Sequence, residues 1–123
     1  MKAMNWIRIA GCLGFVGVAL GAFGAHALRD RLSPDMLAVW QTGVLYHLMH
    51  AAALLALALY GKASGADIRW GALGFTIGIL LFSGSLYALA LTGIRPLGAI
   101  TPLGGASFLA GWGWIACCVS RRS

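Results

Sequence analysis

Long runs of uncharged residues alternate along the chain with short segments that hold the charged positions. The runs cover residues 9–28, 36–61, 70–94 and 96–120, and each is 20 to 26 residues long. A helix needs about 20 apolar residues to cross the ~30 Å hydrocarbon core of a bilayer, so each run is long enough to cross once. Backbone polar groups have no water partner in lipid, and the runs lack the strict alternation of barrel strands. The pattern therefore predicts an all-α integral membrane protein.

Capping and turn residues predict where these helices begin. Ser33-Pro34-Asp35 supplies an N-cap, a proline at the first helical position and an acid in the first turn. Thr101-Pro102 repeats the signal within the last run, at the predicted start of the fourth helix. Short connections make consecutive helices antiparallel neighbours, so we expect a single domain, residues 1–123, built as a four-transmembrane-helix antiparallel bundle. The predicted helices cover approximately residues 6–28, 34–61, 69–92 and 101–120.

Basic residues in the connections predict the orientation of the helices. One side of the membrane would hold six of them, namely Lys2, Arg8, Lys62, Arg69, Arg121 and Arg122. The other side would hold three, namely Arg29, Arg31 and Arg95. Short cytoplasmic segments are enriched in Lys and Arg, so this count places both termini in the cytoplasm.

The composition excludes several classes of protein. Hydrophobic residues make up 60% of the chain, charged residues 10%, and the mean hydropathy is +0.85. A soluble domain carries about 25% charged residues, and a disordered chain is far less apolar. The net charge of +6 is spread in ones and twos, whereas nucleic-acid-binding proteins cluster their basic residues. We therefore expect a lipid bilayer as the partner and no nucleic acid.

Small residues recur at helical spacing in three of the predicted helices. Lipid-embedded helices associate through close backbone approach, which small residues permit. These positions are candidates for helix packing within the bundle or for the interface of a homo-oligomer. The candidate positions are Gly14, Gly17, Gly21, Gly24, Gly74, Gly78, Gly104 and Gly111.

The uncharged runs hold no Lys or Arg, and the acids lie in connections or at a helix start. The ionisable groups left at depth are His47 and His50, which share a helix face, with His26 near the outer end of the first helix. Tyr46 lies four residues before His50 on the same side. If the lipid boundary is near Val39, His50 falls about 16 Å into the membrane, near its centre.

Three interpretations of His26, Tyr46, His47 and His50 stay open. The imidazoles serve only as hydrogen-bonded packing residues, or they line a pocket for a lipophilic ligand such as a quinone, or they ligate haem. No catalytic motif and no Cys/His spacing typical of a metal site is present in the sequence, so nothing indicates an enzyme or a metal centre.

Four motifs resemble a known family: residues 21–28 (GAFGAHAL), 46–51 (YHLMHA), 100–105 (ITPLGG) and Gly111-Trp112. The chain is similar over nearly its whole length to the family called domain of unknown function 423. The resemblance implies a small bacterial inner-membrane protein and carries the family histidines onto His26 and His50. It implies no activity and no cofactor.

Together these observations predict a non-enzymatic oligomeric membrane component or accessory subunit, whose membrane-protein partner is unidentified. The alternative is a protein that binds a lipophilic ligand, quinone or haem through histidines in the outer half of the bundle.

Overall fold

The computed structural model describes residues 3–118, which form helices joined by short connections, with no strand in that range. The first rod is α1 (Ala3–Phe23) continued by the π-helical turn η1 (Gly24–Leu28), and the second is α2 (Pro34–Ser64). The third rod combines α3 (Arg69–Gly78), a second π-helical segment η2 (Ile79–Ser83) and α4 (Gly84–Thr92). The short 3₁₀ helix η3 (Arg95–Ala99) leads into α5 (Thr101–Cys118). The expected helix end at residue 120, together with Lys2, Arg121 and Arg122, lies outside the described residues.

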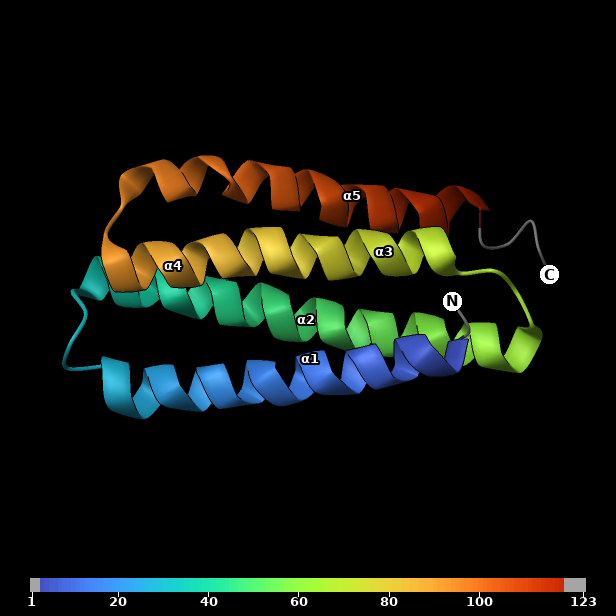
Figure 1. Cartoon of the computed structure of the whole chain (residues 1–123), viewed down its shortest axis with the longest axis horizontal. Coiled ribbons are helices and arrows are strands. Elements are labelled where there is room, and N and C mark those ends of the chain that lie inside the picture. The colour runs from blue at the N-terminus through green and yellow to red at the C-terminus, as the bar shows by residue number, and fades with distance from the viewer. Residues whose placement is uncertain (1–2, 119–123) are drawn as a thin grey trace.

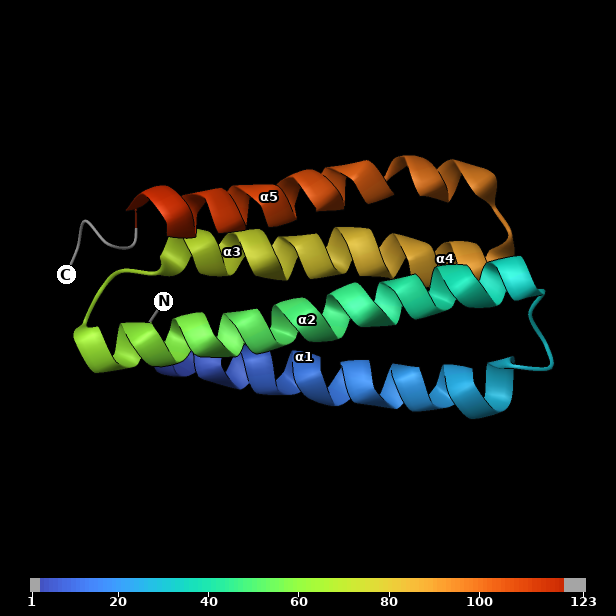
Figure 2. The ribbon, with the colours of Figure 1, turned by 180° about the vertical axis from the view of Figure 1, so that it is seen from behind.

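The rods run antiparallel and lie next to one another in chain order (Figures 1 and 2). Helix α1 packs on α2, α2 packs on the third rod, and α5 packs on α3 and η2. Helices α1 and α5 therefore form the two outer edges (Figure 1). The start of α1, the end of α5 and the connection between α2 and α3 lie at the same end of the molecule.

The helix ends follow from local chemistry. The side chain of Ser33 accepts a hydrogen bond from the backbone N–H of Met36 at 3.2 Å, which satisfies one free donor at the start of α2. Helices α2 and α4 end at Gly65 and Gly93, whose φ angles are +76° and +70°. This left-handed conformation is unfavourable for residues with a Cβ, so glycine ends these helices sharply.

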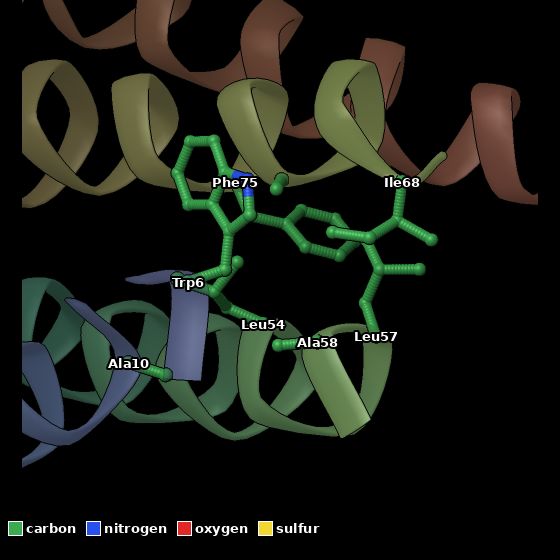
Figure 3. Close-up of a cluster of buried hydrophobic side chains, with 8 residues drawn as sticks. Trp6, Ala10, Leu54, Leu57, Ala58, Ile68 and Phe75 are labelled. Carbon is green, nitrogen blue, oxygen red and sulfur yellow. The ribbon is translucent and has the colours of Figure 1, made fainter. Parts of the chain in front are cut away.

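The largest apolar cluster lies at the end of the molecule that holds the start of α1. Trp6 lies beside Phe75 there, between α1, α2 and α3 (Figure 3). Leu54 and Ala58 of α2 pack below this pair, and Ile68 closes the cluster next to the connection. The cluster joins the first three rods, so these rods form one packed unit.

Three of the helical rods are long and apolar enough to cross a membrane: residues 3–28, 34–64 and 69–92. Many large apolar side chains on the rods point outward, and Phe15, for example, is 78% exposed. Such a surface is stable in hydrocarbon and costly in water.

Candidate functional site

Two side chains of α2 donate hydrogen bonds to backbone carbonyls of α1. Trp40 Nε1 lies 3.0 Å from the Leu20 carbonyl oxygen, and His47 Nε2 lies 2.8 Å from the Leu13 carbonyl oxygen. The donors are seven residues apart, and so are the acceptors, because the two helices keep one antiparallel register. In lipid such bonds between helices contribute about 0.6 kcal/mol each on average, so the pair helps to fix this register.

Glycines of α1 and η1 create the space that these donors need. A Cβ on Gly24 would lie 2.5 Å from Trp40 Nε1, and a Cβ on Gly17 would lie 3.0 Å from the His47 ring. Gly24 and Gly17 each stand four residues after an accepting carbonyl. The missing side chains therefore leave these carbonyls open to a neighbouring helix.

His47 joins α1 to α4 and is buried. A carbonyl only accepts hydrogen bonds, so Nε2 carries the proton that Leu13 receives. In the neutral ring Nδ1 then accepts from the Tyr87 hydroxyl, which lies 2.8 Å away. Both ring nitrogens are used within the chain, so His47 holds helices together and offers no free nitrogen to a ligand.

His50 joins α2 to α5. Its Nδ1 donates to the Tyr46 carbonyl at 2.8 Å, and its Nε2 accepts from Trp112 Nε1 at 3.0 Å. The ring stacks on Phe108, with centroids 3.6 Å apart and planes inclined by 12°. The ring is therefore neutral, has one fixed tautomer and is held in one orientation.

An open groove of about 610 Å³ lies beside the His50–Trp112 pair, between α2, η2 and α5. Its lining is Tyr46, Met49, His50, Phe82, Pro102, Gly105, Ala106, Phe108, Leu109 and Trp112. The volume is within the range of about 300–1,000 Å³ that is typical of small-molecule sites. The aromatic walls favour flat or chain-like apolar molecules.

Tyr46 is the polar residue of the groove that has an unused group. Its side chain is 36% exposed and packs against Phe82, with ring centroids 4.6 Å apart. Its hydroxyl has no hydrogen-bond partner among residues 3–118. A free hydroxyl at membrane depth is costly, so this group is available to a ligand.

The structure brings two of the predicted site residues together at the groove and leaves the other two away from it. Tyr46 and His50 line the groove, whereas His47 faces α1 and Tyr87 on another side of α2. His26 is exposed in η1, on the edge opposite α5 (Figure 1). Neither a hydrogen bond nor a ring contact joins His26 to the other three among the described residues. The candidate site is thus formed by Tyr46 and His50 with side chains of α5.

Seven of the predicted packing glycines are used between helices of this chain. Gly17, Gly21 and Gly24 face Leu48, Val44 and Trp40 of α2. Between the third rod and α5, a Cβ on Gly74 would meet Gly111, and a Cβ on Gly78 would meet Phe108. In the same interface, a Cβ on Gly104 would meet Phe82, and a Cβ on Gly111 would meet Phe75. Gly14 differs, because no atom lies within 4 Å of its Cβ position.

Sequence reasoning missed the residues of α5 that complete the site. Trp112 and Phe108 contact His50 directly, and Phe82 stands in the π-helical segment η2. Their spacing gives no sign of the contact, since α2 and α5 are far apart in sequence. One signal was present: Gly111-Trp112 belongs to the motifs that carry the family resemblance.

The described residues hold no group of three or more His, Cys, Asp or Glu placed to bind a metal ion. The geometry also disfavours His47 and His50 as haem ligands, since all four of their ring nitrogens make hydrogen bonds within the chain.

The helices and their outward apolar surface define an all-α integral membrane protein. A family model described as "Protein of unknown function (DUF423)" matches residues 20–105, and the chain belongs to this family.

A UPF0382 membrane protein of Staphylococcus epidermidis is 43% identical over 110 residues, covering 89% of this chain and 90% of its own. YwdK of Bacillus subtilis, also named a UPF0382 membrane protein, is 48% identical over 79% of this chain and 80% of its own. The Escherichia coli relative YgdD, named an inner membrane protein, is 43% identical over 91% and 86%. No solved structure matches the chain. These relatives confirm the expected family and the membrane class, and they indicate no biochemical activity.

Proposed function

We propose that this protein is a non-enzymatic component of the bacterial inner membrane that binds a lipophilic molecule in the groove between α2 and α5. The observation that carries the proposal is the groove itself: about 610 Å³, aromatic walls, and two polar positions at Tyr46 and the His50–Trp112 pair. Ligand sites have this character, mostly apolar with a few placed polar groups. Haem binding or chemistry at His47 and His50 is less well supported, because their ring nitrogens already make hydrogen bonds within the chain.

The proposed topology has four passes with both termini in the cytoplasm. Helix α5 has 18 described residues, about 27 Å at 1.5 Å per residue, and lies alongside the third rod (Figure 2). Arg8 near the start of α1, and Lys62 and Arg69 around the middle connection, belong to the same end of the molecule. Their charge supports a cytoplasmic position for that end. The name of the Escherichia coli relative supports the inner membrane.

Self-association and a membrane-protein partner stay predictions. Among the described residues, Gly14 is the candidate glycine whose Cβ position has no atom of a neighbouring helix within 4 Å, so it is the position best suited to contact a helix of another molecule.

Photolabelling tests the binding proposal. The probe is an alkylbenzene that carries a diazirine, added to the protein in lipid nanodiscs, and mass spectrometry maps the labelled residues. We expect saturable labelling around Met49 and Leu109, which line the groove. Ala106→Phe fills the groove and should abolish saturable labelling.

Ala110→Phe is the matched control. Ala110 is also exposed on α5 but does not line the groove, so the labelling should persist. Labelling that never saturates in the wild type, or that is equal in the two variants, contradicts the proposal.

A further inference from the structure

The groove contains a hydrogen-bond donor and an acceptor that face each other. Trp112 supplies the donor and His50 the acceptor, 3.0 Å apart, and both residues line the groove. We infer that the groove binds lipophilic molecules that carry a hydroxyl group, which inserts between Trp112 and His50. This inference rests on the proposed function and names its ligand class.

The acceptor role of His50 is fixed by the fold. Nδ1 must carry the ring proton, because its partner is the Tyr46 carbonyl oxygen, which cannot donate. Nε2 of the neutral ring therefore has a lone pair and no proton. Trp112 Nε1 has the reverse limitation, since an indole N–H only donates.

A hydroxyl is the group that satisfies both partners at once. It donates its proton to His50 Nε2, and its oxygen accepts from Trp112 Nε1–H. A ketone, ester or ether oxygen only accepts, so it satisfies Trp112 and leaves Nε2 without a partner. Phenols, quinols and long-chain alcohols therefore fit this pair, whereas quinones, esters and ethers do not.

The position of the pair strengthens this preference. His50 is 3% exposed. With the lipid boundary near Val39, it lies about 16 Å deep, near the bilayer centre. Water is absent there, so a ligand hydroxyl has few other partners and an unpaired Nε2 is costly. Trp112 is 44% exposed on the outer helix α5, so its indole has room to move aside and admit the hydroxyl.

Competition between two probes of similar shape tests the inference. 4-Nonylphenol and 4-nonylanisole each compete with the diazirine-bearing alkylbenzene in nanodiscs, and the anisole carries a methyl group in place of the hydroxyl proton. Insertion of the phenol breaks the hydrogen bond between Trp112 and His50 and forms two new ones, one from Trp112 to the phenol oxygen and one from the phenol hydroxyl to His50. A net gain of one bond corresponds to about fivefold tighter binding, and we expect this preference for the phenol in the wild type.

Three variants locate the acceptor. Trp112→Phe removes the donor and keeps His50 Nε2, so the preference should stay at about fivefold, since one bond is still gained. His50→Phe removes the acceptor, so the phenol and the anisole should compete equally. Trp114→Phe is the control, because Trp114 packs on Gly71 outside the groove and should leave the preference unchanged.

The outcomes separate this inference from the proposed function. Saturable labelling with equal competition by the two probes overturns the hydroxyl preference and leaves the groove as a ligand site. A preference that disappears in Trp112→Phe, or that persists in His50→Phe, moves recognition to another group such as the Tyr46 hydroxyl and overturns the role of His50. If His50→Phe does not fold, loss of the preference in Trp112→Phe still overturns the role of His50.

Discussion

Gly74→Ala tests whether close backbone contact holds α3 to α5. A Cβ at this position would lie 2.8 Å from the Gly111 Cα and 3.1 Å from the Ser107 carbonyl oxygen. Carbon atoms pack at about 3.5–4.0 Å, so the two helices must separate by roughly 0.7 Å or more. The atoms that block the methyl group are backbone, which cannot turn away as a side chain does. The hydrogen bond from Ser107 Oγ to the Gly74 carbonyl, 2.8 Å long, would stretch as well.

Gly14→Ala provides the matched control. Both glycines stand within regular α-helix and both precede a phenylalanine, but Gly14 has no atom within 4 Å of its Cβ position. Replacing glycine by alanine raises helix propensity by up to about 1 kcal/mol, and this gain cancels between the two variants. Overpacking costs about 1–3 kcal/mol, and a hydrogen bond between helices contributes about 0.6 kcal/mol. We therefore expect Gly74→Ala to be less stable than Gly14→Ala by about 2–3 kcal/mol.

Reversible unfolding in mixed micelles of lipid-like detergent and dodecyl sulfate measures the difference in unfolding free energy. Circular dichroism should show that both variants remain helical under native conditions. A difference below about 0.5 kcal/mol would show that α3 and α5 are not in close backbone contact, and would refute the reasoning.

Two further substitutions test the hydrogen bonds of α2. Trp40→Phe keeps an aromatic ring beside Tyr87 but loses the bond to the Leu20 carbonyl and part of a buried side chain, so the unfolding free energy should fall by more than the ~0.6 kcal/mol of the bond; no loss would mean that the bond is absent in lipid. Tyr87→Phe leaves Nδ1 of the buried His47 without a hydrogen-bond donor, so the unfolding free energy should fall by about 1–2 kcal/mol. The imidazole ¹⁵N resonances of His47 should shift as well, and unchanged resonances would contradict the assigned bond.

The contacts of the two buried histidines explain why one residue type serves two purposes in this fold. His47 binds a carbonyl of α1 and a hydroxyl of α4, and it does not line the groove beside His50. His50 stands one turn further along α2, and its partner Trp112 is partly exposed at the groove. The first contact stabilises the helix arrangement, and the second leaves a polar pair where a ligand has access to it.

Sequence reasoning identified half of the candidate site. It selected Tyr46 and His50 as polar groups at membrane depth, because ionisable residues are rare there and each one needs a reason. It also grouped His26 with them, since the outer end of the first helix is near in a schematic bundle. In the structure α1 and α5 form opposite edges, so His26 and the groove are separated (Figure 1). The order of the helices decides this, and hydropathy contains no information about it.

The sequence by itself determined that the chain is helical and embedded in lipid, because uncharged runs of about 20 residues have one stable solution in a medium without water. Only the tertiary structure decided what each position does, and the two Gly-Phe pairs show why. Phe15 is 78% exposed beside the open Gly14, whereas Phe75 is 0% exposed beside Gly74, which touches α5. The same dipeptide takes opposite environments because burial depends on which neighbouring helix covers the face. The partners of His50 depend on the same packing register between helices, which forms only when the rods meet.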